Sequence, residues 1–106
     1  MFPAELPEDQ KLLKSVLEPL LEDFLYWFDL SLKALEKDQL SFMTEAEQQT
    51  FIARIRQAQA EVGAAKLMFQ ATDGGAAIDM KVVMPWHQLV SECWGIAQKR
   101  RQSQAS

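Results

Sequence analysis

The residues of this 106-residue chain that are best suited to chemistry are its single histidine, His87, and its single cysteine, Cys93. One histidine excludes a multi-histidine metal site, and one cysteine excludes an intrachain disulfide. The two residues lie nearly two helical turns apart and point in different directions, so a Cys–His nucleophilic pair is not expected. We expect Cys93 to be a small buried hydrophobe, as most free cysteines are. His87 is expected near the surface at the start of a helix, where it could bind a partner.

The acidic cluster Glu18, Glu22 and Asp23 does not match a known metal-binding pattern. Carboxylate di-metal bundles need Glu-x-x-His pairs on two helices, and the chain has none. Phosphate-binding glycine loops and serine nucleophile elbows are also missing from the sequence. The sequence therefore predicts no catalytic residue, no metal site and no cofactor.

Aromatic residues give the strongest indication of a binding function. Residues 24–28 read Phe-Leu-Tyr-Trp-Phe, and these side chains would surround most of a helix, so they cannot all face one core. Trp86 and Trp94, eight residues apart, are expected on roughly the same face of a later helix. Tryptophan and tyrosine dominate binding hot spots, and three tryptophans exceed the needs of a small core. The candidate partner-binding residues are Glu22, Tyr26, Trp27, Trp86, His87 and Trp94.

Apolar spacing of three and four residues predicts a first helix over about 8–36. Its apolar side chains cover more than one face, so two neighbouring helices or a second chain must cover it. Pro19 lies inside this segment and predicts a kink or a short break near Glu18.

A capping box, Thr44 followed by Glu47, predicts the start of a second helix over about 45–71. An apolar stripe runs along this segment, and small residues beside it favour close approach of a neighbouring helix. The stripe is Phe51, Ile55, Ala58, Val62, Ala65 and Phe69, and the small residues are Ala58, Gly63, Ala64 and Ala65. The residues expected to face water are Gln48, Gln49, Arg54, Arg56, Gln57, Gln59 and Glu61.

Asp73-Gly74-Gly75 predicts the end of the second helix. Residues 76–84 could be helix, a short strand or irregular chain, and we favour helix or irregular chain because a lone strand forms no sheet. Pro85 is expected to be the first residue of a last, shorter helix. The basic run Lys99-Arg100-Arg101 is expected to complement the dipole at the end of that helix.

These elements predict an all-α protein with one domain over residues 1–106. Two long helices would form a hairpin, with a shorter C-terminal helix packed across them as a three-helix bundle that a second copy could complete. The ordered core would cover about residues 8–101, with short flexible tails.

The charge distribution bears on partners and location. The net charge is −4, and the first fifty residues are acidic whereas the remainder is basic. An acidic half argues against a nucleic-acid partner. Apolar runs of five residues are too short to cross a bilayer, and no signal peptide is evident. We therefore expect a cytoplasmic protein, or one bound peripherally to a membrane.

Two sequence runs, residues 12–28 and 84–94, resemble a small cyanobacterial domain-of-unknown-function family of the DUF2605 type. The first run contains Pro19 and Tyr26-Trp27-Phe28, and the second contains Pro85-Trp86-His87 and Cys93-Trp94. The resemblance covers about residues 10–100. It implies a protein of photosynthetic organisms with a partner in a thylakoid assembly, and it brings no activity, cofactor or site residue.

The leading hypothesis is a non-catalytic helical adaptor that binds another protein. A second copy of this chain is one of the partners that this hypothesis includes. The alternative is a carrier of an apolar small molecule, a pigment or lipid, held between the helices. An enzyme that uses Cys93 or His87 is the least favoured hypothesis.

Overall fold

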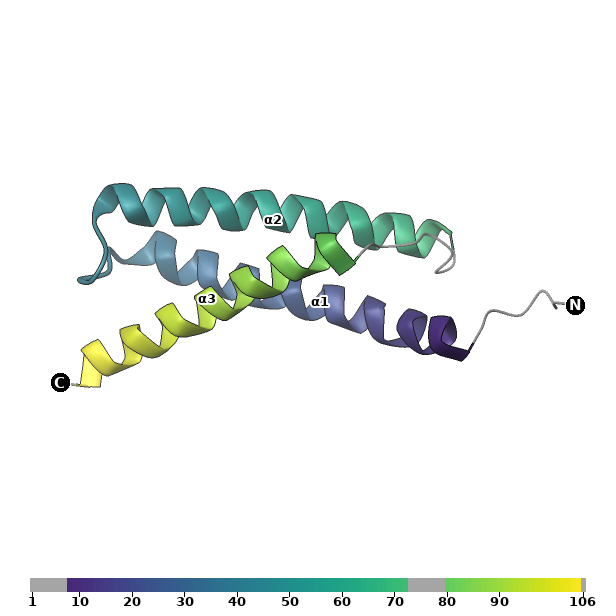
Figure 1. The fold of residues 1–106 in the computed structure, drawn as a ribbon. Helices are drawn as coiled ribbons and strands as arrows, with labels where there is room; N and C mark the ends of the chain where they lie inside the picture. Colours follow the sequence, from purple (N-terminus) through teal and green to yellow (C-terminus); the bar gives the residue numbers. More distant parts are fainter. Residues whose placement is uncertain (1–7, 73–79, 106) are drawn as a thin grey trace, which may run out of the picture.

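The computed structural model describes residues 8–72 and 80–105, with side chains described over residues 15–72 and 81–102. It contains three helices in this part of the chain: α1 (Glu8–Lys37), α2 (Glu45–Ala71) and α3 (Met80–Ala105). The helices α1 and α2 form an antiparallel hairpin, and α3 crosses it diagonally (Figure 1). The predicted all-α, three-helix architecture is confirmed.

The core lies where the three helices meet. Its largest fully buried side chains come from all three helices: Phe28 and Leu21 from α1, Ile55 and Val62 from α2, and Val90 from α3. The predicted α2 stripe is buried apart from Ala65, which is partly buried against the core. One cluster of apolar side chains therefore ties α3 to the hairpin.

The turn between α1 and α2 is held by a buried amide. Gln48 is 2% exposed; its Nε2 donates to the carbonyl oxygens of Leu35 (2.7 Å) and Asp38 (2.8 Å), and its Oε1 accepts from the Leu40 N–H (2.9 Å). Carbonyls in the last turn of a helix lack intrahelical partners, so the amide satisfies groups that burial would leave unpaired. The prediction that Gln48 faces water is wrong. The prediction was based on the polarity of the side chain, but the amide is buried because it hydrogen-bonds to the backbone of the turn.

The start of α2 follows the predicted capping box. The Glu47 N–H donates to Thr44 Oγ1 at 3.0 Å, and the Thr44 N–H donates to Glu47 Oε1 at 2.8 Å. Hydrogen bonding of the Glu47 carboxyl to the Thr44 backbone N–H, and secondarily to the Thr44 side chain, lowers its pKa because it favours the charged form. At the other end α2 stops at Ala71, as predicted, whereas Asp73-Gly74-Gly75 lies outside the described residues.

The helix α1 runs unbroken through Pro19, so the predicted alternative of a short break is wrong. Pro19 is exposed, and the buried neighbours Leu17 and Leu21 keep their packing on either side of it. Burial of these leucines offsets the loss of one backbone hydrogen bond.

The helix α3 begins at Met80, five residues before the predicted start at Pro85, and is nearly as long as α2. Val83 and Trp86 are both buried, so packing holds the turn that contains Pro85 in helical form. Residues 80–84 are therefore helix, and residues 102–105, which were expected in the flexible C-terminal tail, are helix as well. Residues 76–79, the N-terminal tail over 1–7 and Ser106 lie outside the described residues. At the other end α3 continues to Ala105, with no basic residue in its last turn, so the dipole-complementing role predicted for Lys99-Arg100-Arg101 is not supported.

The small residues of α2 do not form the predicted close-packed seam. Ala58 is buried and Ala65 is partly buried, but Ala64 is exposed. A Cβ atom added at Gly63 would meet no heavy atom within 4 Å. Successive residues rotate by about 100° around a helix, which turns Gly63 and Ala64 away from the buried Val62.

Candidate functional site

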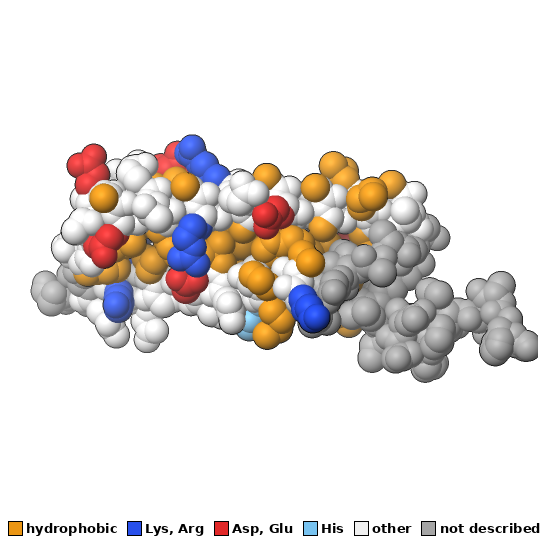
Figure 2. Space-filling view, turned by 45° about the horizontal axis from the view of Figure 1, so that its top comes forward, with side chains coloured by type: hydrophobic (Ala, Val, Ile, Leu, Met, Phe, Trp, Pro, Cys, Tyr) orange, Lys and Arg blue, Asp and Glu red, His pale blue; other side chains and the backbone are white. Residues whose placement is uncertain are grey.

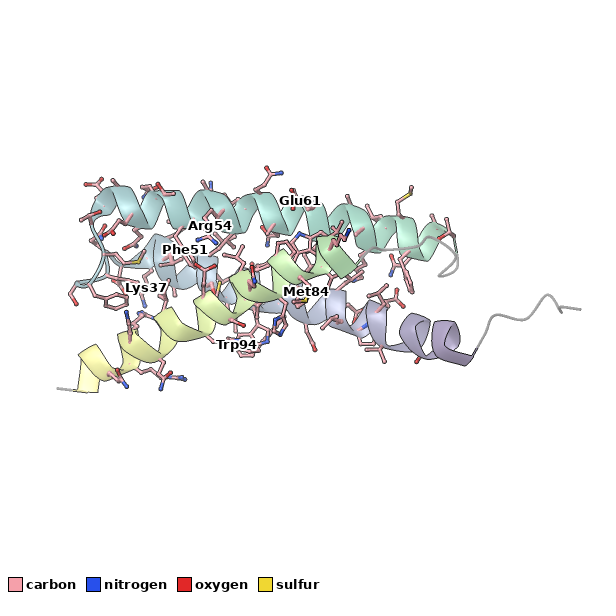
Figure 3. All side chains as sticks on the ribbon, in the orientation of Figure 1. Lys37, Phe51, Arg54, Glu61, Met84 and Trp94 are labelled. Carbon is pink, nitrogen blue, oxygen red and sulfur yellow. The ribbon has the colours of Figure 1, made fainter. Side chains whose placement is uncertain are left out.

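Three aromatic side chains form a continuous cluster at the surface between α1 and α3. The rings of Tyr26 and Trp27 pack edge to face with centroids 5.3 Å apart, and those of Trp27 and Trp94 do so at 5.6 Å. Tyr26 is 58% exposed, Trp94 is 45% exposed, and Trp27 is half-buried between them. Leu30, 41% exposed, is one helical turn from Tyr26. We name Tyr26, Trp27, Leu30 and Trp94 the aromatic surface; Figure 3 labels Trp94 on α3.

The structure places Trp86 elsewhere. Trp86 is 4% exposed and its Nε1 donates to Glu61 Oε1 at 3.0 Å, so it belongs to the core and joins α3 to α2. The expectation that Trp86 and Trp94 share a face is wrong. Eight residues advance a helix about 80° beyond two full turns, which is enough to separate a buried side chain from an exposed one.

The remaining predicted partner-binding residues are exposed but do not join the aromatic cluster. Glu22 faces Lys66 of α2 with Oε1 and Nζ 3.6 Å apart. The His87 ring lies edge-on to Phe24, with centroids 6.5 Å apart. Both residues contact a neighbouring helix at the surface.

Cys93 is buried, as predicted. Burial raises the pKa of its thiol, and the Ser31 hydroxyl, in hydrogen-bond contact with the sulfur, acts in the opposite direction. A buried thiol of raised pKa is a poor nucleophile near neutral pH. Among the described residues, no group of three or more His, Cys, Asp or Glu side chains is placed to hold a metal ion.

A groove of about 310 Å³ lies beside the aromatic surface, between α1 and α3. Trp27, Leu30 and Trp94 form its rim, so the aromatic surface and the groove are continuous. Its floor is made of four core side chains, and the end nearest the C-terminus of α3 carries two arginines. The floor residues are Leu35, Leu40, Phe51 and Cys93, and the arginines are Arg100 and Arg101. Sequence patterning predicted Trp27 and Trp94 but not the groove, which exists only because α3 crosses α1 at an angle.

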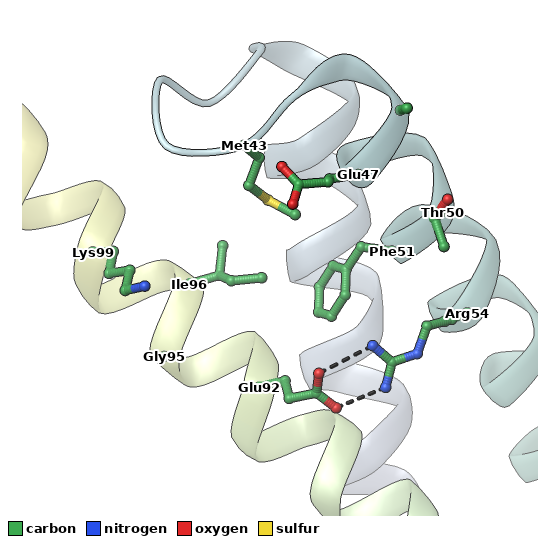
Figure 4. Close-up of a pocket in the computed structure, with 10 residues that line it drawn as sticks. Met43, Glu47, Thr50, Phe51, Arg54, Glu92, Gly95, Ile96 and Lys99 are labelled. Carbon is green, nitrogen blue, oxygen red and sulfur yellow. Dashed lines mark hydrogen bonds and ion pairs between the residues drawn. The ribbon is translucent and has the colours of Figure 1, made fainter.

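A second and wider groove of about 590 Å³ lies between α2 and α3 (Figure 4). Arg54 of α2 and Glu92 of α3 span it with two hydrogen bonds, of 3.0 and 2.7 Å. The hydrogen bonds from Arg54 lower the pKa of the Glu92 carboxyl.

In Figure 2, apolar side chains form a band along the middle of one face, with charged side chains mainly at its borders.

None of the three helices, within the described part of the chain, combines the length and apolar character that a bilayer-crossing helix requires.

The sequence model of the family described as "Protein of unknown function (DUF2605)" matches residues 7–102. The chain belongs to the DUF2605 family. The match includes all four residues of the aromatic surface and both arginines of the α1–α3 groove. No curated protein and no solved structure matches the chain.

Proposed function

We propose that this DUF2605 protein is a non-catalytic adaptor that binds another protein through the aromatic surface. The observation that carries the proposal is the chain of edge-to-face contacts from Tyr26 through Trp27 to Trp94. It places two large, exposed aromatic rings on either side of a half-buried one.

Such an arrangement has the features of a protein-binding hot spot. Tyrosine and tryptophan offer large contact areas with few rotatable bonds, so their immobilisation on binding costs little. Trp27 contacts both neighbours, which fixes the rings before any partner arrives. Large contiguous apolar patches on the surface of a monomeric protein often mark interaction sites.

The kind of partner follows from the family resemblance and not from geometry. We propose a protein of a thylakoid or photosynthetic assembly, met at the cytoplasmic face of the membrane. A second copy of the chain is the competing occupant, because the same surface could pair with itself.

Affinity capture with matched variants tests the proposal. Tagged wild type, the double variant Tyr26→Ala/Trp94→Ala and the control Phe42→Ala would each be used on separated soluble and membrane fractions of gently lysed source cells. Phe42 is also an exposed aromatic, but it stacks with Lys99 near the α1–α2 turn. We expect a stoichiometric protein with wild type and Phe42→Ala that is lost with the double variant. Equal capture by all three, or no partner in either fraction, would refute the adaptor.

A carrier of an apolar small molecule is a second candidate function, because the α1–α3 groove is a preformed apolar concavity. Its volume of about 310 Å³ is at the lower end of the range of small-ligand sites, roughly 300–1,000 Å³.

A further inference from the structure

We propose that the α1–α3 groove binds the free carboxylate of a medium-chain alkyl acid, with the chain along the groove and the carboxylate at Arg101. The inference rests on the carrier function named above and specifies its ligand. The groove shares Trp27, Leu30 and Trp94 with the aromatic surface, so the two proposals are distinguished by their tests and not by separate residues.

The body of the groove suits an alkyl chain. Trp27 and Trp94 lie at one end, Ala34 and Ala97 line its sides, and the core residues beneath are almost fully buried. Small side chains facing each other on α1 and α3 leave room that larger residues would fill. An alkyl chain placed there would remove apolar surface from water on both sides, which is the main source of affinity for such ligands.

The charged end of the groove suits an anion. Arg100 and Arg101 line it, and no aspartate or glutamate is among its lining residues. Arg100 is already paired, since its Nη2 lies 3.2 Å from Asp38 Oδ2, whereas Arg101 is exposed. The end of α3 does not account for these cations, because the helix continues to Ala105 with no basic residue in its last turn. In a chain of net charge −4, the exposed guanidinium of Arg101 beside an apolar groove favours an amphiphile with an anionic head.

The length of the groove limits the ligand. Trp94 and Arg101 are seven residues apart on α3, which corresponds to about 10.5 Å along the helix. Each C–C bond of about 1.5 Å advances an extended chain by somewhat less than its length, so roughly eight to ten carbons fit between the tryptophans and the guanidinium. Decanoate is the appropriate probe.

Calorimetric titration of the full-length protein with decanoate, and with decanol as the uncharged analogue, tests the assignment. Arg101→Gln removes the proposed carboxylate partner. Lys99→Gln is the matched control, because Lys99 lies two residues away with the same charge but lines the α2–α3 groove. Ala97→Trp fills the α1–α3 groove, and Gln98→Trp adds the same bulk at the adjacent exposed residue, which lines neither groove.

We expect one decanoate per chain, no binding to Ala97→Trp, and unchanged binding to Gln98→Trp and Lys99→Gln. Arg101→Gln should weaken decanoate about two- to fivefold, as for an exposed ion pair, and leave decanol unchanged. Absence of decanoate binding to wild type, retained binding in a folded Ala97→Trp, or equal effects of Arg101→Gln on both probes would overturn the proposal. If Ala97→Trp does not fold, the Arg101→Gln and Lys99→Gln comparison decides alone.

Phosphatidylglycerol vesicles distinguish the free acid from a membrane lipid. The proposal predicts no vesicle binding that depends on Arg101. Vesicle binding lost in Arg101→Gln, without decanoate binding, would show that the groove recognises a lipid surface instead. The adaptor proposal fails separately if wild type captures no protein partner, because that result does not depend on decanoate binding.

Discussion

Trp27 of α1 and Trp94 of α3 pack edge to face with ring centroids 5.6 Å apart, and this contact joins the two helices at the surface. The third tryptophan, Trp86, lies in the core with its indole N–H bound to Glu61. One helix thus carries one tryptophan for folding and another on the aromatic surface.

The two α3 tryptophans should therefore differ in their effects on stability. Trp86→Ala creates a cavity and should lower the free energy of unfolding by about 3–5 kcal/mol. Trp94→Ala removes an exposed ring and one aromatic contact, and should lower it by about 1 kcal/mol. Urea denaturation followed by circular dichroism measures both. An equal or larger loss for Trp94→Ala would contradict the assignment of the two residues.

Gln48→Ala should destabilise the protein by about 2–4 kcal/mol. The substitution leaves the buried Leu35 carbonyl, the part-buried Asp38 carbonyl and the buried Leu40 N–H without their partner. The exposed neighbour Gln49 provides the control, since Gln49→Ala should change stability by less than about 0.5 kcal/mol. The same denaturation experiment compares them, and similar values for the two variants would show that the amide does not hold the turn.

Gly63→Ala should stabilise the protein by about 0.5–1 kcal/mol. Alanine lowers the conformational entropy of the unfolded chain, and its added methyl group would meet no neighbouring atom in the folded one. Thermal unfolding of the variant and wild type gives the sign. A lower melting temperature for Gly63→Ala would contradict this account. It would indicate that another helix packs closely against Gly63, as the sequence had predicted.

The Arg54–Glu92 pair should contribute to stability at neutral pH and less in acid. Hydrogen bonds from Arg54 lower the folded-state pKa of Glu92 below its ordinary value of 4.5. The contribution is therefore complete above pH 4.5 and is lost as the pH falls through the folded-state pKa. Both side chains are nearly half exposed, which limits the contribution to below about 1 kcal/mol.

Unfolding of wild type and Glu92→Gln at pH 7 and pH 3 measures this contribution. We expect wild type to be the more stable protein at pH 7, and the difference to shrink at pH 3. A difference that stays constant or grows in acid would contradict the role given to the pair.

Local signals in the sequence predicted much of the fold. The Thr44–Glu47 capping box and the apolar stripe of α2 fix both the start of that helix and its buried face. These features depend on residues within one or two turns of each other, so their physics is visible in the sequence.

Tertiary contacts decided what the sequence could not show. Because Val83 is buried, α3 begins before Pro85. The side chain of Gln48 is buried because it hydrogen-bonds to the backbone at the α1–α2 turn. Three of the four residues of the aromatic surface, Tyr26, Trp27 and Trp94, were named from the sequence, whereas Leu30 was missed and the candidate Trp86 is buried. Their role in partner binding stays a prediction. The α1–α3 groove depends on the angle at which α3 crosses the hairpin, and no residue spacing encodes that angle.

Site-specific photo-crosslinking tests the central claim, protein recognition at the aromatic surface, most directly. A benzophenone amino acid would replace Tyr26 in one variant and Phe42 in the other, and both would be irradiated in intact source cells. The adaptor predicts one protein adduct of discrete mass from residue 26 and no such adduct from residue 42. No adduct from residue 26, or the same adducts from both residues, would contradict it.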